Sequence, residues 1–188
     1  KRQTLYLLRQ GIDPKDTHRI IELLDDINIT FKSDEGSNIT LLNGEVVEGD
    51  IRSMAVSEKV SEVSTIPQVR KAMVAQQQLL GKGKGVVMDG RDIGTVVFPD
   101  AELKIFMTAE TNIRAKRRQL ELAERGVELS LEEIVANLEK RDAIDTSREE
   151  SPLLKASDAL VVDTSYLSFD EQVEQVVEAA REHIAEKR

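Results

Sequence analysis

The spacing of hydrophobic residues predicts two short helices at the start of the sequence. Apolar residues recur every three to four positions in residues 2–10, and Gly11 is a typical residue just past a helix end. Asp16 is suited to cap a second helix over about 17–26, because its carboxylate can accept a hydrogen bond from a backbone amide of the first turn. We therefore expect helices at this end of the chain.

The pattern then changes to alternation of apolar and polar residues over 27–48, which predicts strands. Asn43-Gly44 is a strong signal for a two-residue hairpin. Two helical patterns follow, over about 54–64 and about 67–80. We interpret residues 27–80 as an inserted small domain that contains a three-stranded antiparallel meander and helices.

From residue 85 onward, short apolar runs alternate with helical patterns, which argues for a parallel sheet flanked by helices. The expected core strands are Val86–Met88, Glu102–Met107 and Asp158–Asp163. We expect three helices in this part of the chain. One covers about 110–125, a second opens at the capping box Ser130–Glu133, and the last opens at a second capping box, Ser168–Glu171. The side chains that the last helix is expected to bury are Val173, Val176, Val177, Ala180 and Ile184. We expect an α/β core domain made of residues 1–26 and 81–188.

A cluster of polar residues follows the first of these predicted strands. In an open parallel sheet, ligands bind just past the carboxyl ends of the strands, and Asp89-Gly90-Arg91-Asp92 lies at such an end. Arg91 can hold a phosphate or a carboxylate through two hydrogen bonds, and Asp92 can accept hydrogen bonds from a base, a sugar or Arg91. The alternative is a loop held by its own Arg–Asp pair.

Two further groups of arginines are candidates for binding anions. Residues 114–118 place four cations in the first turns of a predicted helix, where the helix dipole favours acids instead. Arg141, Asp145 and Arg148 are spaced by four and three, so they share one face if their helix continues. Each group is either an anion site or a set of surface charges, paired or solvated.

Composition and charge narrow the classes of function. The 188 residues carry a formal net charge of −9, contain no cysteine and include only 3% aromatic residues. An acidic chain is not expected to bind duplex nucleic acid by bulk electrostatics, and scarce aromatics disfavour a stacking platform for single strands. No apolar run approaches the roughly 18 residues that span a bilayer. We expect no nucleic-acid partner and no membrane, and the lack of cysteine fits the cytoplasm.

The remaining chemistry points to phosphoryl transfer. His18 and His183 lie in predicted surface helices, and the sequence has neither metal-ligand spacing of His or Cys nor a G-x-S-x-G motif. Arginines and aspartates without a nucleophile suit phosphoryl transfer, which depends on positioning and charge neutralisation. The motif G-x-x-x-x-G-K-[ST] is absent, and Gly81–Gly85 is no substitute, because it precedes a predicted strand instead of opening a helix.

Two long stretches resemble the signatures of the bacterial cytidylate kinases. They are Met88–Ala101 and Arg141–Leu153, and the resemblance, which extends over essentially the whole chain, includes Ala156–Ala159. It implies a P-loop nucleoside-monophosphate-kinase fold with a mobile lid at about 113–150, and an enlarged monophosphate-binding domain at 27–80. It also implies the reaction, in which ATP phosphorylates CMP or dCMP with Mg²⁺.

The resemblance further implies how the acceptor nucleotide is held. Ser61, Arg70 and Asp92 would read the cytosine, whose exocyclic amine donates and whose ring nitrogen and carbonyl accept. Arg91 and Arg148 would hold the monophosphate.

The other implied roles concern the sugar, the lid, the donor and the metal. Asp145 would bind the sugar hydroxyls, and Arg141 would join the phosphates from the lid as a third catalytic arginine. Arg117 would contact ATP, and Asp89 would join the Mg²⁺ and water network.

One part of the family pattern is not in this sequence. The family begins with a strand, a P-loop and a helix, and we expect residues upstream of Lys1 to carry them, because the parallel sheet would otherwise lose its central strand. The alternatives are a truncated fragment that holds the monophosphate without transferring phosphate, and a related kinase with another acceptor, such as UMP. We expect a monomer.

Overall fold

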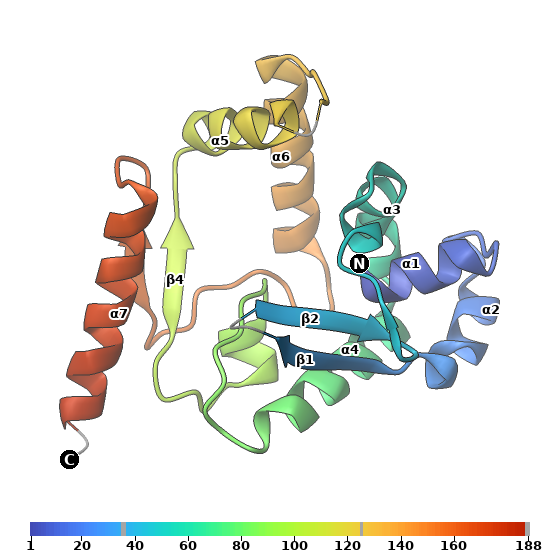
Figure 1. The fold of residues 1–188 in the computed structure, drawn as a ribbon, viewed down its shortest axis with the longest axis horizontal. Coiled ribbons are helices and arrows are strands. Elements are labelled where there is room, and N and C mark those ends of the chain that lie inside the picture. The colour runs from blue at the N-terminus through green and yellow to red at the C-terminus, as the bar shows by residue number, and fades with distance from the viewer. Residues whose placement is uncertain (35–36, 125, 187–188) are drawn as a thin grey trace. The chain divides into compact units, whose positions relative to one another are not determined.

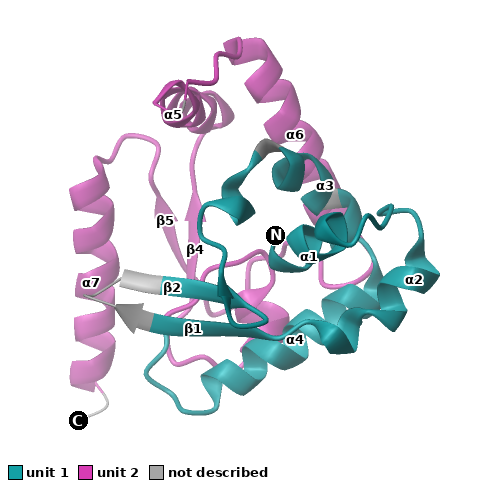
Figure 2. Ribbon diagram, turned by 45° about the vertical axis from the view of Figure 1, so that its right-hand side comes forward, with its two compact units in different colours: residues 1–86 teal, residues 87–188 magenta. Residues whose placement is uncertain are grey.

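The computed structural model describes residues 1–34, 37–124 and 126–186. The chain divides into two compact units, unit 1 from Lys1 to Val86 and unit 2 from Val87 to Arg188 (Figure 2). Each unit has its own sheet, antiparallel in unit 1 and parallel in unit 2.

Unit 1 opens with the two helices that the sequence predicts. Helix α1 spans Arg2–Arg9, and Gly11 follows it with a φ of +68°, the left-handed conformation that glycine adopts without strain. Helix α2 spans Thr17–Glu22, and the side chain of Asp16 accepts a hydrogen bond from the backbone N–H of Arg19. A 3₁₀ turn at Leu24–Asp26 continues α2, so the predicted helix is confirmed with a tighter final turn.

The predicted antiparallel meander is confirmed. Strands β1 (Ile29–Asp34), β2 (Ser37–Leu42) and β3 (Glu45–Val46) lie in the order β1-β2-β3. Asn43 and Gly44 form the turn with φ values of 51° and 86°, as the hairpin signal requires. The Asn43 side chain accepts from the backbone N–H of Asn28 at 2.7 Å and donates to the carbonyl of Asp26 at 2.9 Å.

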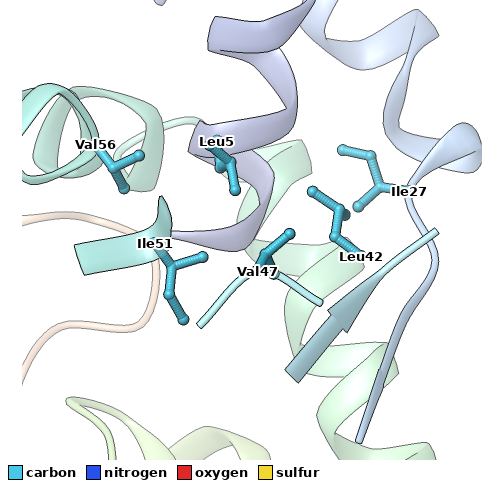
Figure 3. Packing of buried hydrophobic residues seen from close by; sticks show 6 residues of the cluster. All are labelled: Leu5, Ile27, Leu42, Val47, Ile51 and Val56. Atoms are coloured by element: carbon cyan, nitrogen blue, oxygen red, sulfur yellow. The ribbon is translucent and has the colours of Figure 1, made fainter. Parts of the chain in front are cut away.

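Helices α3 (Met54–Ser64) and α4 (Pro67–Gly81) confirm the other two predicted helices of this half. Leu5 of α1 packs in a buried cluster whose other members are Ile27, Leu42, Val47, Ile51 and Val56 (Figure 3). Leu7, on the same helix, packs with Ile20, Val63, Ile66 and Val69. Helix α1 thus shares both cores of unit 1 with residues 27–80, and the assignment of 1–26 to the other domain stays a prediction.

Unit 2 contains the parallel strands β4 (Ile105–Thr108) and β5 (Leu160–Asp163), paired from Ile105 with Leu160 to Thr108 with Asp163. Its helices are α5 (Thr111–Ala123), α6 (Leu131–Ser147) and α7 (Phe169–Glu186). Helix α7 runs beside β4 in Figure 1, and Figure 2 shows β5 next to β4. Ala115, Leu122 and Ile134 join α5 to α6. The predicted combination of parallel strands and helices is confirmed.

The prediction of a buried strand at Val86–Met88 is wrong. Residues 84–90 have no regular structure, and Val87 is 99% exposed. A strand needs a neighbour that accepts and donates its backbone hydrogen bonds, and within the described residues the parallel sheet of unit 2 contains only β4 and β5. Hydrophobicity alone indicated burial but not a partner strand.

The predicted burial of the α7 side chains is also wrong. No side chain of α7 within the described residues is fully buried, and Val173, Val177 and Ile184 are exposed. Val176 and Ala180 are half-buried. A helix is covered only as far as the layer beside it extends, and a sheet of two strands is too narrow to cover a complete apolar stripe.

Candidate active site

The segment after residue 88 turns sharply at Asp92. Residues Ile93–Val97 form a short π-helix, η3, and the carbonyl of Asp92 accepts hydrogen bonds from the backbone N–H groups of Val96 at 2.9 Å and Val97 at 3.2 Å. Asp92 itself is half-buried. A Cβ atom at Gly90 would lie 2.7 Å from Cγ1 of Ile93, so any larger residue there would force the Ile93 side chain to shift. π-Helical turns often occur at functional sites.

Helix α6, in the same unit, contains the first part of the second signature, Arg141–Leu153. The Ser130–Glu133 capping box is present at its start, and the helix runs without interruption to Ser147. Arg148 follows as the capping residue with an extended ψ of 143°, so the helix ends there. Arg148 thus lies just beyond the helix that was expected to carry it, but it still meets Asp145, since its Nη1 lies 3.0 Å from Oδ1 of that residue.

Arg148 is held firmly by its surroundings. Its side chain is 7% exposed, and its Nε donates to the carbonyl of Ser151 at 2.8 Å. The carbonyl of Asp145 in turn accepts from the backbone N–H of Leu153 at 2.7 Å, which secures the chain beyond the helix. A buried guanidinium with paired charge and fixed geometry is well suited to recognise an anion.

Arg91 reaches the same carboxylate from the other signature. Its Nε lies 2.8 Å from Oδ2 of Asp145, whose side chain is 14% exposed. One carboxylate therefore orients two guanidinium groups, and the cluster keeps a net positive charge. This bond uses one of the five N–H groups of Arg91, so the guanidinium can still donate to a phosphate. The structure thus brings Arg91, Asp145 and Arg148 together.

Arg141 lies on α6, one turn before Asp145, and is half-buried. Arg70 belongs to unit 1, where it lies on α4 and its Nη1 donates to the carbonyl of Ser64 at 3.5 Å. The backbone of Ser61 belongs to α3, and its side chain lies outside the described part of the chain. The joint role of Ser61 and Arg70 with Asp92 in reading cytosine stays a prediction.

The arginines of α5 have partners within unit 2. Nη2 of Arg114 lies 2.7 Å from Oδ2 of Asp142 on α6, and Nη1 of Arg118 lies 2.6 Å from Oε2 of Glu121. Arg117 donates to the hydroxyl of Thr164 at 3.2 Å and to the carbonyl of Leu167 at 3.2 Å. Arg114 and Arg118 are therefore surface charges paired with carboxylates. The contact of Arg117 with ATP stays a prediction.

Asp89 is exposed in the irregular segment 84–90. Within the described residues, no three His, Cys, Asp or Glu side chains gather as a possible metal site. Mg²⁺ commonly binds one or two carboxylates together with phosphate oxygens and water, so a single exposed aspartate fits a metal that arrives with a nucleotide.

One buried charge, on Lys104, was not predicted from the sequence. Lys104 interrupts the apolar run before β4, and its side chain pairs with Asp158 at 2.7 Å. The hydrogen bond from Lys104 holds the pKa of Asp158 below its ordinary value. A lysine inside a predicted core strand was the signal that could have identified this pair.

Comparison with known proteins decides the family. The family model described as cytidylate kinase matches residues 1–182. The chain belongs to the cytidylate kinase family. The family assignment makes the protein an ATP-dependent phosphotransferase and confirms the resemblance seen in the two signatures.

Individual cytidylate kinases match most of the chain. The protein named cytidylate kinase from Cytophaga hutchinsonii is 52% identical over 178 residues, which cover 94% of this chain and 76% of that protein. The one from Bacteroides thetaiotaomicron is 56% identical over 176 residues, 91% of this chain and 77% of that protein. The one from Porphyromonas gingivalis is 48% identical over 185 residues, 95% of this chain and 80% of that protein.

A membrane-crossing helix is not found among the described residues, since none of their helices is both long enough and apolar enough.

Proposed function

We propose that this cytidylate kinase transfers the γ-phosphate of ATP to CMP or dCMP and releases ADP and the nucleoside diphosphate. The observation that carries the proposal is the cluster of Arg91, Asp145 and Arg148, in which one carboxylate orients two arginines. The family match over residues 1–182 supplies the reaction class.

The arginine pair suits the acceptor phosphate. A nucleoside monophosphate carries close to two negative charges at neutral pH, and these repel the negatively charged γ-phosphate of ATP. Arg91 and Arg148 would neutralise the acceptor phosphate and hold its oxygen in line for transfer, which is the main task of a protein in phosphoryl transfer. Because Arg148 is already fixed by Asp145 and Ser151, little reorganisation is needed when the nucleotide binds.

Asp145 can bind a sugar hydroxyl and keep both arginines. A carboxylate has about four acceptor sites on its two oxygens, and the two bonds from Arg91 and Arg148 use one on each oxygen. The remaining sites suit the hydroxyls of ribose or deoxyribose. In this proposal, Asp145 positions the two phosphate-binding arginines and also contacts the sugar.

Cytosine would be read by Asp92, Arg70 and Ser61. The carboxylate of Asp92 would accept from the exocyclic amine, while Arg70 and Ser61 would donate to the ring nitrogen and the carbonyl. This donor and acceptor pattern fits cytosine and disfavours uracil, whose corresponding edge carries a carbonyl. If UMP bound in this site, the carboxylate of Asp92 would face a carbonyl, which cannot donate a hydrogen bond to it.

Arg117 and Arg141 would contact the donor nucleotide and the phosphates, respectively, and Asp89 would hold Mg²⁺ through its carboxylate. Bound Mg²⁺ supplies charge neutralisation between the phosphates. The chain spans about three quarters of the length of the Cytophaga relative. A monomeric state and a cytoplasmic location stay predictions.

The experiment that tests the function is a coupled ADP-release assay on the full-length protein with CMP, dCMP, UMP and AMP as acceptors. We expect turnover with CMP and dCMP to exceed turnover with UMP and AMP. Preference for UMP would support a kinase of a different pyrimidine, and binding of CMP without ADP release would support a non-catalytic monophosphate-binding protein. Omission of Mg²⁺ should abolish turnover.

A further inference from the structure

Lys104 connects the starts of both strands in unit 2. It directly precedes β4, and its side chain is only 9% exposed, which is rare for lysine unless its charge is paired. Its ammonium donates to both carboxylate oxygens of Asp158, at 2.7 and 3.0 Å. The backbone carbonyl of Lys104 also accepts from the N–H of Leu160 at 2.9 Å, so backbone and side chain join the same two segments.

The same side chain holds η3 at two points. Its ammonium donates to the carbonyl of Pro99, just beyond the end of η3. Its methylene groups pass beside Gly94 within η3, where an added Cβ atom would lie 3.4 Å from Cδ and 3.5 Å from Cγ of Lys104. Lys104 therefore contacts the π-helical segment both inside it and past its end.

The position of η3 determines the position of Asp92. The carbonyl of Asp92 accepts the hydrogen bonds from Val96 and Val97 that form the π-helical turn. A shift of η3 would therefore displace Asp92. The contacts form a continuous path from Asp158 through Lys104 and η3 to Asp92.

We propose that Lys104 is a positioning residue for the acceptor site, which places Asp92 by clamping η3 onto the start of the parallel strand pair. This inference rests on the proposed function, in which Asp92 reads the cytosine. Lys104 acts through Asp92 and touches no substrate. The role needs an ammonium that bonds to a carboxylate and a carbonyl, on a stem that passes beside a glycine. Methionine at this position keeps the shape of the stem but lacks the charge.

The test compares Lys104→Met with the wild-type, full-length enzyme. We expect the KM for CMP to rise about tenfold, because a displaced recognition group weakens acceptor binding. The KM for ATP should stay unchanged, since the path ends at the acceptor side. Asp158→Asn should raise the KM for CMP less, because the bond to Pro99 remains. Lys155→Met, at an exposed lysine in the same unit, is the matched control and should leave both constants unchanged.

A purely structural role makes different predictions. Loss of stability alone would lower the thermal midpoint and the active fraction, and would leave both KM values as in wild type. That result would overturn the inference. If Lys104→Met does not fold, Asp158→Asn carries the same test, and an unchanged KM for CMP in that variant would also overturn it.

A double-mutant cycle tests the path itself. If Lys104 acts through Asp92, the change Lys104→Met should raise the KM for CMP in the wild-type background and have little further effect in Asp92→Ala. An equal rise in both backgrounds would show that Lys104 acts elsewhere and overturn the inference. Wild-type enzyme without CMP turnover would overturn the proposed function and this inference together, whereas normal wild-type turnover with an unaffected Lys104→Met would overturn the inference alone.

Discussion

Nε of Arg91 lies 2.8 Å from Oδ2 of Asp145, although the two residues are 54 positions apart in the chain. The other oxygen of the same carboxylate pairs with Arg148 at 3.0 Å. Two separate signature segments therefore meet at one carboxylate, which pairs with an arginine from each. This relationship makes Asp145 the most informative residue to change.

Asp145→Asn should lower kcat/KM for CMP by about 100-fold. The change keeps the shape but removes the charge that orients both arginines, and hydrogen bonds to charged groups contribute about 1.5–3 kcal/mol each. Steady-state kinetics with CMP as the varied substrate measure the effect. Asp142→Asn is the matched control, since Asp142 lies on the same helix and pairs with Arg114 instead. Similar losses in both variants would show a general effect on α6.

Gly90→Ala should destabilise unit 2 by about 1–3 kcal/mol, because the new methyl group would lie 2.7 Å from Cγ1 of Ile93 and force that side chain to move. Urea unfolding followed by circular dichroism measures the change. Gly83→Ala is the control, since nothing lies within 4 Å of a Cβ atom there. Ile93→Ala should cost less stability in the Gly90→Ala background than in wild type, because it removes the side chain that the new methyl group meets. Equal stability of the two glycine variants would contradict the close approach.

Asn43→Ala should cost more stability than Asn43→Gly. The φ of 51° at Asn43 is left-handed, which costs about 1 kcal/mol or more for an alanine but not for a glycine. Both variants lose the side-chain bonds to Asn28 and Asp26, so their difference isolates the backbone conformation. Thermal unfolding measures it. Identical midpoints for the two variants would contradict the left-handed turn.

The capping box of α6 predicts a dependence of stability on pH. Hydrogen bonds from the backbone and hydroxyl of Ser130 lower the pKa of Glu133 below its ordinary value. Because the folded-state pKa is the lower one, the stabilisation is present above the ordinary pKa and is lost as the pH falls through the folded-state value. The difference in free energy of unfolding between wild type and Glu133→Gln should therefore shrink in acid. Urea unfolding at neutral and acidic pH measures it, and a constant difference would refute the effect.

The sequence alone was sufficient for features that depend on nearby residues. Helices α3, α4 and α6, the Asn43-Gly44 turn and the capping boxes arise from hydrogen bonds and side-chain spacing within a few positions, so local pattern predicts them. The pairing of Asp145 with Arg148 was predictable for the same reason, since the two residues are three positions apart at the end of α6. The two long signatures are also continuous stretches of sequence, and they were sufficient to indicate the family.

Tertiary structure decided everything that depends on what packs beside a segment. The apolar run at Val86–Met88 indicated a buried strand, yet burial requires a neighbouring strand, and Val87 is exposed. The predicted burial of the apolar side chains of α7 was wrong, because the two-stranded sheet beside the helix leaves much of it uncovered. The meeting of Arg91 with Asp145 and the burial of Lys104 are likewise contacts across about fifty residues. Periodicity describes which side of an element is apolar, whereas only the folded chain determines which distant group that side meets.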